Sequence, residues 1–250
     1  MSKLSVLVIT KNEEEHLSDC LESVRWADEI VVVDSGSTDK TEEIAKKYTK
    51  EVYYNEWLGY SEQKNWGAQK CRNDWVLCLD ADERISLELR TEIEEALEEK
   101  NFNGYFLPTK DFIFGKWILH GKWSPQEHIR LYKKSKGSWT KDVHEVVQVN
   151  GGVGHLKNPI LHVGHTDVSE FISKLNLYTQ KEADDRFKAG EKISIGKLVF
   201  NSFRAFLREY VKGQGYKDGE HGFVLAVLMS FYQFSKDVKL WEHWYKKGHT

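Results

Sequence analysis

The stretch Ile30-Val-Val-Val-Asp-Ser-Gly-Ser-Thr-Asp39 joins an apolar, β-branched run to an acidic loop. Four consecutive apolar residues are typical of a strand that is buried on both faces of a sheet, and Asp, Ser and Gly favour the turn that follows. A second stretch, Trp75-Val-Leu-Cys-Leu-Asp-Ala-Asp82, has the same plan, with two carboxylates directly after the apolar run. The chain is therefore predicted to contain two buried strands that each end in an acidic loop.

Outward from these two strands, the N-terminal half alternates strand-like and helix-like segments. Strands are expected at residues 4–9, 30–33, 52–54, 75–79 and 105–107. Helices are expected at residues 13–24, 41–48 and 61–70, and a further one after Ser86 as its cap. This alternation predicts an α/β fold with a mostly parallel sheet and helices on both faces. Because ligands bind beyond the carboxyl ends of such strands, the two acidic loops are expected to converge.

The second half of the chain has a different pattern. Residues 110–165 are rich in Gly, Trp and His, and we expect a loop-and-hairpin region folded against the sheet. From residue 168 onward the pattern is helical, with helices expected near 168–189, 194–213 and 220–245. The chain is thus predicted to form a domain of residues 1–165 and a C-terminal helical extension of residues 166–250.

Composition excludes several classes of protein. The formal net charge of −3 over 250 residues lacks the basic footprint of a nucleic-acid-binding protein. The three cysteines form neither a metal-binding pattern nor an even set, so we expect reduced, buried thiols in a cytoplasmic protein. The longest uncharged apolar stretch, residues 222–235, is shorter than the roughly 20 residues of a membrane-spanning helix. We expect a soluble or peripherally bound protein.

The acidic loops carry the candidate chemistry. Asp80 and Asp82 flank one residue, and two such carboxylates can hold a hard divalent cation against phosphate oxygens. The alternative is a solvated acidic turn before the next helix. Asp34 is suited to bind a ribose hydroxyl or a base imide, whereas Asp39 suits either the same site or the start of the following helix. The segment Thr10-Lys-Asn-Glu13 would line the same opening or form a polar, capping loop.

Four segments taken together resemble the family 2 glycosyltransferases in their order and spacing. They are Ser5-Val-Leu-Val-Ile-Thr-Lys-Asn-Glu13, Val31-Val-Val-Asp-Ser-Gly-Ser-Thr-Asp39, Lys64-Asn-Trp-Gly-Ala68 and Leu79-Asp-Ala-Asp82. The resemblance implies a GT-A, Rossmann-like fold and inverting transfer from a nucleotide-diphosphate sugar. It further implies Mg²⁺ or Mn²⁺ bound at Asp80 and Asp82. The donor contacts that it implies are at Thr10, Asn12, Glu13 and Asp34, and Lys64, Asp80 and Arg130 are further candidate donor contacts.

Two of these donor contacts have structural alternatives. Lys64 stands where many family members carry Arg, so it either contacts the donor phosphates or is an exposed helix lysine. Arg130 either neutralises the diphosphate or is an exposed strand residue.

The second half resembles a narrower bacterial subgroup. The similar segments include Arg130-Leu-Tyr132, Val143-His-Glu-Val146, Leu161-His162, Asp218-Gly-Glu-His-Gly-Phe223 and Lys239-Leu-Trp-Glu242. That subgroup includes glucosyltransferases that extend the heptose of the lipopolysaccharide inner core. The resemblance implies UDP-glucose as the donor and a glycolipid or oligosaccharide as the acceptor.

The catalytic base is assigned from what an inverting displacement needs. Many processive family members place a Glu-Asp pair at the head of a helix, and this chain has none. Glu145 is the predicted substitute that removes the proton of the acceptor hydroxyl, and an exposed His-Glu pair on a strand is the alternative. His144 would orient this base or contact phosphate. His162 and His165 are either third metal ligands, diphosphate contacts or structural histidines.

The C-terminal helices are predicted to contact the inner membrane face without crossing it. An apolar stripe with interleaved Arg204, Arg208 and Lys212 suits an anionic lipid surface, and residues 239–247 add aromatics and lysines. The stripe consists of Phe203, Phe206, Leu207, Tyr210 and Val211. Packing in the core or in a homodimer is the alternative. Residues 222–235 are apolar nearly all round and are assigned to the core.

Three other functions compete with glycosyl transfer. A sugar-phosphate nucleotidyltransferase resembles this pattern but has a Gly-rich loop after its first strand, which is missing here. An aspartyl phosphatase would carry Thr or Val where Arg84 stands. A non-catalytic scaffold at the membrane is disfavoured because both acidic loops are intact.

Overall fold

The computed structural model describes residues 2–123, 126–140, 145–164 and 167–248. The chain forms two compact units, and one of the boundaries between them falls within the long strand Gly104–Ile113. The sheet unit comprises Met1–Lys110 and Pro125–Val163, and the helical unit comprises Asp111–Ser124 and Gly164–Thr250. The two units are described separately below.

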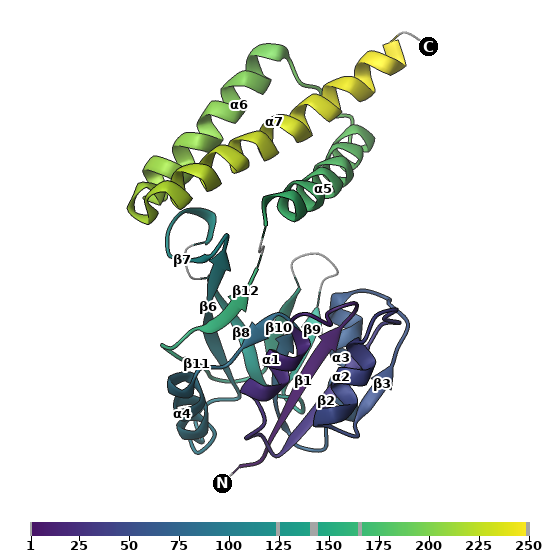
Figure 1. Ribbon diagram of the computed structural model, residues 1–250, viewed down its shortest axis with the longest axis vertical. Helices are drawn as coiled ribbons and strands as arrows, with labels where there is room; N and C mark the ends of the chain where they lie inside the picture. The colour runs from purple at the N-terminus through teal and green to yellow at the C-terminus, as the bar shows by residue number, and fades with distance from the viewer. Residues whose placement is uncertain (1, 124–125, 141–144, 165–166, 249–250) are drawn as a thin grey trace. The chain divides into compact units, whose positions relative to one another are not determined.

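The sheet unit is built on four parallel strands in the order β3-β2-β1-β4 (Figure 1). They are β1 (Leu4–Thr10), β2 (Glu29–Asp34), β3 (Val52–Tyr54) and β4 (Trp75–Asp80). β1 and β2 are buried along their whole length, which explains why their sequences show apolar runs rather than alternation. Together with the helices on both faces, this arrangement confirms the predicted α/β, GT-A-type class.

Beyond β4 the sheet continues through β8, β6, β12 and β5, and β8 is antiparallel to both β4 and β6. The bounds are β5 (Glu83–Arg84), β6 (Gly104–Ile113), β8 (Gln126–Lys133) and β12 (Ile160–Val163). A short β11 (Val153–His155) pairs with β6, while β9 (Gly137–Thr140) and β10 (Val146–Val149) form a separate hairpin. The region expected to fold against the sheet therefore supplies strands of the sheet itself.

The two faces of β1 belong to different hydrophobic clusters, as the alternation of side chains along a strand requires. Val6 and Val8 pack in a cluster with residues of α1, α2 and α4, whereas Leu7 and Ile9 pack in one with residues of α3 and the β9–β10 hairpin. The helices are α1 (Leu17–Ser23), α2 (Thr41–Tyr48), α3 (Tyr60–Lys70) and α4 (Leu87–Ala96). The sheet is thus covered on both sides, and its ligand-binding edge is left to the loops.

Helix boundaries follow local hydrogen bonds. Ser86 accepts a hydrogen bond from the Leu89 amide and caps α4, as predicted. The first helix begins at Leu17 rather than at residue 13, because the preceding loop bonds to the loop after β2. In those bonds the Glu13 amide donates to Thr41 Oγ1 at 2.8 Å, and the Thr38 amide donates to Asn12 Oδ1 at 2.8 Å.

In the helical unit, α7 packs against both α5 and α6 (Figure 1). A buried Asp237 on α7 accepts hydrogen bonds from Arg186 of α5 at 2.7 Å and from Asn201 of α6 at 3.0 Å. The helices are α5 (Val168–Lys188), α6 (Ile195–Leu207) and α7 (Glu220–Gly248). A π-helical turn η2 (Arg208–Lys212), 3₁₀ turns η1 (Gly121–Trp123) and η3 (Gly215–Asp218), and strand β7 (Lys116–Ile118) complete the unit.

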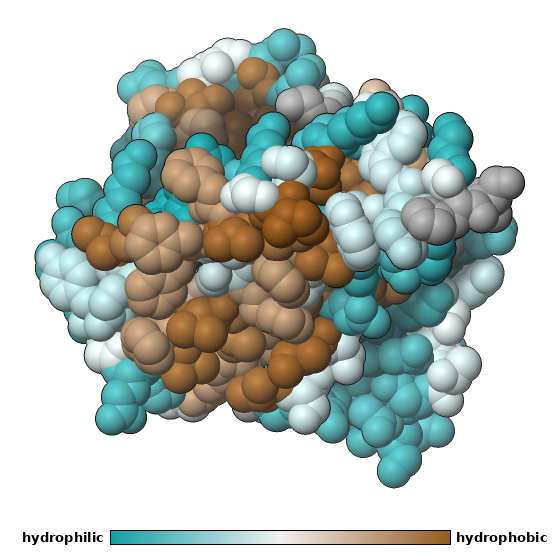
Figure 2. Space-filling model, turned by 90° about the horizontal axis from the view of Figure 1, so that it is seen from above, coloured by the Kyte–Doolittle hydropathy of each residue, from teal (hydrophilic) through white to brown (hydrophobic). Residues whose placement is uncertain are grey.

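The assignment of residues 222–235 to the core is wrong for half of that segment. Leu225, Ala226 and Met229 are buried, but the side chains on the other side of α7 are exposed. Those exposed side chains are Phe223, Val224, Val227, Phe231 and Phe234. Figure 2 shows apolar side chains gathered on this face of the helical unit. The reason is that α7 packs against α5 and α6 through only part of its surface, which leaves these side chains partly exposed.

The cysteines are buried and free, as predicted. Burial raises the pKa of Cys71 and of Cys78 to about 12, so these thiols stay protonated at neutral pH. Within the described ranges, we find no helix that combines the length and the apolar character needed to cross a membrane.

Candidate active site

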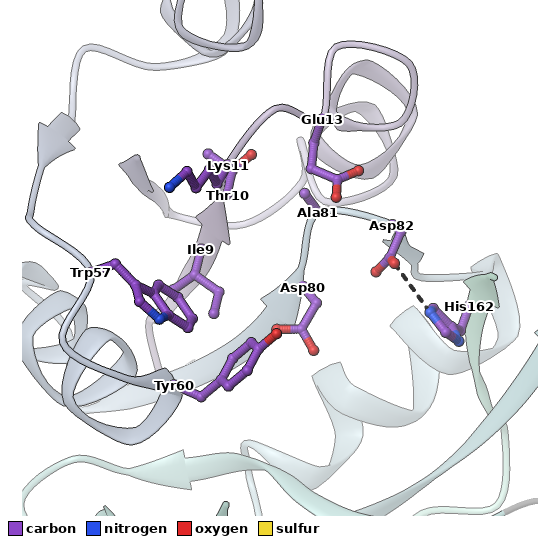
Figure 3. A pocket seen from close by; sticks show the side chains of 10 residues that line it. All are labelled: Ile9, Thr10, Lys11, Glu13, Trp57, Tyr60, Asp80, Ala81, Asp82 and His162. Atoms are coloured by element: carbon purple, nitrogen blue, oxygen red, sulfur yellow. Dashed lines mark hydrogen bonds and ion pairs between the residues drawn. The ribbon is translucent and has the colours of Figure 1, made fainter. Parts of the chain in front are cut away.

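A cavity of about 510 Å³ opens at the carboxyl ends of β1 and β4, where ligands of such sheets bind (Figure 3). The segment after β1 and the Asp-x-Asp loop after β4 both line it. The lining residues are Ile9, Thr10, Lys11, Glu13, Trp57, Tyr60, Asp80, Ala81, Asp82 and His162. Residues 34–39 are not among these lining residues, so the predicted convergence of the two acidic loops on one cavity is not observed, whereas Thr10 and Glu13 lie on the cavity as expected.

His162 lies beside Asp82 in this cavity. Its Nε2 is 3.2 Å from Asp82 Oδ2, and about 30% of each side chain is exposed. Backbone pairing produces this contact, because β12 pairs with β5 and the Val163 amide donates to the Asp82 carbonyl oxygen at 2.9 Å. A carboxylate and an imidazole therefore face the cavity together.

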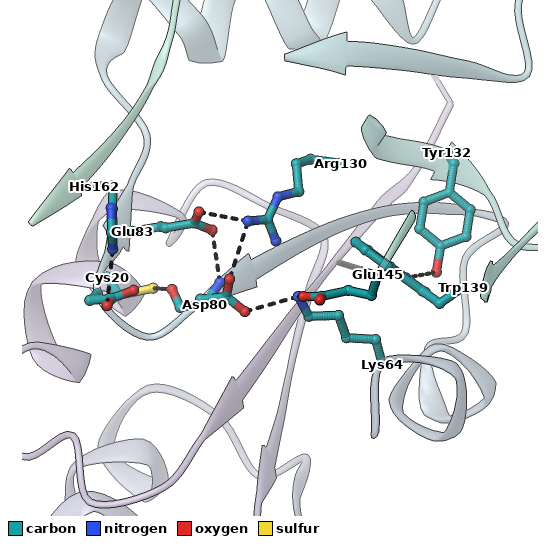
Figure 4. Close-up of polar contacts among 10 residues, drawn as sticks. Cys20, Lys64, Asp80, Glu83, Arg130, Tyr132, Trp139, Glu145 and His162 are labelled. Carbon is teal, nitrogen blue, oxygen red and sulfur yellow. Dashed lines mark hydrogen bonds and ion pairs between the residues drawn. The ribbon is translucent and has the colours of Figure 1, made fainter. Parts of the chain in front are cut away.

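Asp80 is held by two cations, Lys64 and Arg130 (Figure 4). Lys64 Nζ lies 3.1 Å from Asp80 Oδ1, and Arg130 Nη2 lies 3.2 Å from Asp80 Oδ2. The same lysine nitrogen is 3.1 Å from Glu145 Oε1. The predicted base is thus joined to the Asp-x-Asp motif through one ammonium group.

Lys64 is not the exposed helix lysine that one interpretation of the sequence proposed. It has no exposed surface, and its ammonium group also lies 4.6 Å from the centre of the Trp139 ring. Burial and the nearby Arg130 oppose the charged form, but Asp80, Cys78 and Glu145 together more than offset them, and the pKa of Lys64 is raised. The lysine stays protonated and bridges the two carboxylates.

Arg130 is likewise not an exposed strand residue, because its side chain is only 12% exposed. Besides Asp80 it contacts Glu83 at 2.9 Å, and Glu83 Oε2 accepts a hydrogen bond from the Asp80 amide. Burial and the neighbouring Asp80 and Asp82 raise the pKa of Glu83 to about 7, despite the arginine. Arg130 Nε and Nη1 and Thr10 Oγ1 are buried and have no hydrogen-bond partner among the described residues. Such atoms usually find a partner in a ligand or a water molecule.

The loop after β2 is organised by its own carboxylates. Asp34 is buried and accepts hydrogen bonds from the amides of Gly36 and Ser37, both at 2.8 Å. Asn12 has a left-handed backbone with φ of 55° and joins this loop to the one after β1. Asp39 accepts hydrogen bonds from the Thr41 amide and hydroxyl in the first turn of α2, which agrees with its helix-start alternative. Although desolvation opposes it, these bonds lower the pKa of Asp39.

Some lining residues escaped the sequence analysis. Trp57 and Tyr60 form an edge-to-face pair with ring centres 4.6 Å apart on this cavity. The signal was present, since two aromatic residues flank a glycine in the loop between a strand and a helix. His144 and His165, two further sequence candidates, lie outside the described residues. In the part of the chain that the structure describes, no cluster of three or more His, Cys, Asp or Glu side chains is arranged to hold a metal.

Comparison with known proteins identifies the family. The sequence model of the family Glycosyl transferase family 2 matches residues 5–153, which include both acidic loops and the helix that carries Lys64. The chain belongs to glycosyl transferase family 2. It is therefore a glycosyltransferase, as the sequence motifs predicted.

Similar proteins cover nearly all of this glycosyltransferase. LpsC of Rhizobium meliloti, a lipopolysaccharide core biosynthesis glycosyltransferase, is 30% identical over 96% of this chain and 92% of its own. The uncharacterized glycosyltransferase RT0209 of Rickettsia typhi is 34% identical over 97% of this chain and 88% of its own. Among solved structures, S. aureus TarS 1–349 in complex with UDP-GlcNAc has a TM-score of 0.49 and 15% identity, covering 98% of this chain and 92% of that one.

The geometry around Lys64 predicts a pH-dependent loss of stability in Lys64→Met. Removing the ammonium group leaves Asp80 and Glu145 without the cation that they share. The free energy of local unfolding of β1 and β4 should therefore fall by about 3 kcal/mol at neutral pH. Burial raises the pKa of Asp80, but Lys64 and Arg130 overcome this and hold it well below its usual value. The stabilisation is therefore present above the ordinary aspartate pKa of about 3.9 and is lost as the pH falls through the lower folded-state value. The difference between the variant and the natural protein should shrink in acid.

Hydrogen exchange of the β1 and β4 amides measures this free energy in the sheet unit alone. Lys70→Met on the same helix is the matched control, because Lys70 is exposed, and it should change the free energy by less than about 0.5 kcal/mol. Equal effects of the two substitutions would contradict the assigned role of Lys64.

Proposed function

We propose that this glycosyltransferase moves a hexose, with inversion, from a nucleotide-diphosphate sugar to a lipopolysaccharide-core or other cell-surface glycan. The observation that carries the proposal is the joining of Asp82, Asp80 and Glu145 in one site at the carboxyl ends of β1 and β4. The reaction needs one group of residues that stabilises the diphosphate leaving group and another residue that accepts the proton of the acceptor hydroxyl. UDP-glucose is the proposed donor, from the likeness to heptose-extending glucosyltransferases.

The donor set fits a divalent cation. Asp82 and His162 lie 3.2 Å apart and face the cavity; a carboxylate would suit Mg²⁺ or Mn²⁺, whereas an imidazole would suit a transition metal such as Mn²⁺ better than Mg²⁺. Both oxygens of Asp80 are near cations, so we propose that Asp82 and His162 contact the ion directly. Asp80 would not contact the ion, but its negative charge would attract the ion to the neighbouring Asp82 and His162. When bound, the cation would neutralise charge on the departing diphosphate.

The proposed base is Glu145, held by Lys64. It accepts the proton of the acceptor hydroxyl while that oxygen forms a bond to the anomeric carbon of the donor. The bond from this carbon to the diphosphate oxygen breaks with its electron pair, and the nucleoside diphosphate leaves. About 23% of the Glu145 side chain is exposed, which gives an acceptor a route to it. Lys64 acts here as a positioning residue, and a direct donor contact by Lys64 stays a prediction.

The remaining donor contacts are proposed from position and hydrogen-bonding capacity. Thr10 and Glu13 line the cavity, and Thr10 Oγ1 has capacity for a donor group. Arg130 carries two buried nitrogens that suit phosphate oxygens. Asp34 is proposed to bind ribose or base, and Asn12 is proposed to act through the loop that both residues hold in place.

The donor assignment predicts that UDP-glucose is hydrolysed slowly, and in a metal-dependent way, when no acceptor is present. Screening UDP-, GDP- and dTDP-sugars with Mg²⁺ or Mn²⁺ measures this, and Asp82→Asn should reduce turnover roughly a hundredfold, the scale of losing a main electrostatic stabiliser. Asp185→Asn, an exposed aspartate on α5, is the control. Full turnover in excess EDTA would sink the metal assignment.

The base assignment predicts a turnover defect without a binding defect. Glu145→Gln keeps the size of the side chain but accepts no proton, so turnover should fall by about 10²–10⁴ while calorimetry shows donor binding nearly unchanged. Glu62→Gln, an exposed residue of the Lys64 helix, is the control. Normal turnover by a variant that binds the donor normally would refute the role of Glu145.

We further propose that the helical unit binds the cytoplasmic face of the inner membrane, where a glycolipid acceptor would be found. Phe200 and Phe203 of α6 are 60% and 59% exposed, and the apolar side chains on the exposed side of α7 are 41–49% exposed. Between residues 195 and 217 the chain has five basic residues, and its one acidic residue, Glu209, is buried. The basic residues are Lys197, Arg204, Arg208, Lys212 and Lys217. An exposed apolar face bordered by cations is complementary to anionic lipid, and a homodimer interface is the alternative.

The membrane proposal predicts flotation with liposomes that contain anionic lipid. Binding should weaken at high salt, because screening reduces attraction between exposed charges. The double substitution Phe200→Ser and Phe203→Ser should abolish flotation, whereas Leu177→Ser, at an exposed leucine of α5, should not. A protein that never floats, yet glycosylates a soluble acceptor without detergent, would overturn the proposal. Dissociation of a dimer by the double substitution would assign the face to self-association instead.

A further inference from the structure

The active-site cavity has an aromatic wall to which the proposed reaction assigns no role. The wall consists of Trp57 and Tyr60, whose rings meet edge to face with centres 4.6 Å apart. Trp57 is 41% exposed and Tyr60 is 45% exposed. Both rings line the cavity and are only partly covered by protein, so a molecule in the cavity can contact them.

The backbone before Tyr60 has a conformation that is open to glycine almost alone. Gly59 has φ of 128° and ψ of 159°, and it immediately precedes α3. Tyr60 is the first residue of that helix, and the Gln63 amide donates to the Gly59 carbonyl oxygen at 3.0 Å. The sharp turn at Gly59 accounts for the contact between two rings that are only three residues apart in the sequence.

Hydrogen bonds tie both ends of this aromatic segment to the loop after β2. On the side of β3, the Asn55 amide donates to the Asp34 carbonyl oxygen at 3.0 Å. On the side of α3, Gln63 has no exposed surface, and its Nε2 donates to Ser35 Oγ at 2.8 Å. Asn55 Nδ2 donates to Gln63 Oε1 at 2.6 Å, which joins the two ends to each other. The segment that carries both rings is therefore fixed beside Asp34, the residue proposed to bind the ribose or the base.

The charged lining residues indicate which part of a nucleotide sugar meets the aromatic wall. In Figure 3, Trp57 lies on one side of the cavity, and Asp82 and His162 lie on the other. The base and the β-phosphate are at opposite ends of a nucleoside diphosphate. The diphosphate belongs with the cation proposed at Asp82 and His162, so the base extends toward Trp57. The face of an aromatic ring is partly negative and disfavours phosphate, whereas a planar, uncharged base stacks on it.

We propose that the nucleobase of the sugar donor stacks on the ring of Trp57, which Tyr60 holds in place. This inference rests on the proposed use of a nucleotide-diphosphate sugar, and it names the residue that binds the base of that donor. For the proposed donor UDP-glucose, the base is uracil. Stacking on an aromatic ring stabilises any base, so Trp57 supplies affinity without selecting among bases. Trp57 touches no reacting atom in this assignment and is a binding residue, not a catalytic one.

Calorimetry with UDP and with inorganic pyrophosphate, both in the presence of Mn²⁺, tests the proposal. The two ligands share the diphosphate and the ion, but only UDP has a base. Trp57→Ala should weaken UDP binding about tenfold, the scale of losing one base–aromatic stack, and should change pyrophosphate binding by less than about twofold. Trp57→Phe keeps an aromatic ring and should weaken UDP binding less than Trp57→Ala does.

Trp241→Ala is the matched control. Trp241 is also a partly exposed tryptophan, at 37%, and its ring is paired with Tyr245 at 5.2 Å, but it does not line the cavity. Its substitution should change UDP binding by less than about twofold. Hydrogen exchange of the β1 and β4 amides should be the same in Trp57→Ala as in the natural protein, which shows that the sheet is intact.

UDP binding that Trp57→Ala leaves unchanged overturns the proposal, and weaker binding of UDP-glucose alone would then assign the ring to the hexose. Equal weakening of UDP and pyrophosphate binding also overturns it, because the substitution would then act on the diphosphate end of the site. In each of these cases the natural protein binds UDP, so its use of a nucleotide-diphosphate sugar stands. A natural protein that binds none of UDP, GDP and dTDP would instead contradict the proposed function, and this inference with it.

Discussion

The sheet-unit site depends on one buried ammonium group that is shared by two carboxylates. Lys64 has no exposed surface and lies 3.1 Å from both Asp80 and Glu145. Removing such a charge from water is unfavourable by several kcal/mol, and the position is tolerated because both carboxylates face it. Asp80 ends β4 and Glu145 directly precedes β10, so the shared ion pair also holds the β9–β10 hairpin beside the end of the central strand. Stability and site geometry are therefore properties of the same contact.

The parallel half of the sheet is predictable from sequence because its signals are local. β1 to β4 appear as apolar runs, and each acidic loop directly follows its strand. The antiparallel half of the sheet is not predictable from sequence. Its strand β8 enters the sheet by pairing with β4 and β6, and nothing in the short extended pattern of β8 specifies those partners. The same limit applies to side chains. Lys64 has the sequence context of an exposed helix lysine, and His162 reaches Asp82 only through the pairing of β12 with β5. For α7, an apolar composition does not reveal how many neighbours cover the helix.

The net charge of −3 conceals a division of charge between the two units. In the sheet unit the carboxylates of Asp80, Glu83 and Glu145 gather around Lys64 and Arg130, and carboxylates outnumber cations. In the helical unit, residues 195–217 have the opposite balance, with five basic residues and one acidic residue. Whole-chain composition therefore excludes a large basic surface of the kind that binds nucleic acid, but it does not exclude local basic sites. The acidic cluster suits a cation and a nucleotide, while the basic segment suits an anionic surface.

Sharing one lysine between two carboxylates also keeps the site negatively charged. If Lys64 paired with Glu145 alone, it would neutralise the charge of Glu145. Lys64 is instead shared between Glu145 and Asp80, and Arg130 contacts the second oxygen of Asp80. Arg130 is in turn shared with Glu83. The network consequently fixes each carboxylate in place without neutralising all of them. A group that must accept a proton has to be both ionised and immobile, and a shared cation meets the second requirement while leaving net negative charge for the first.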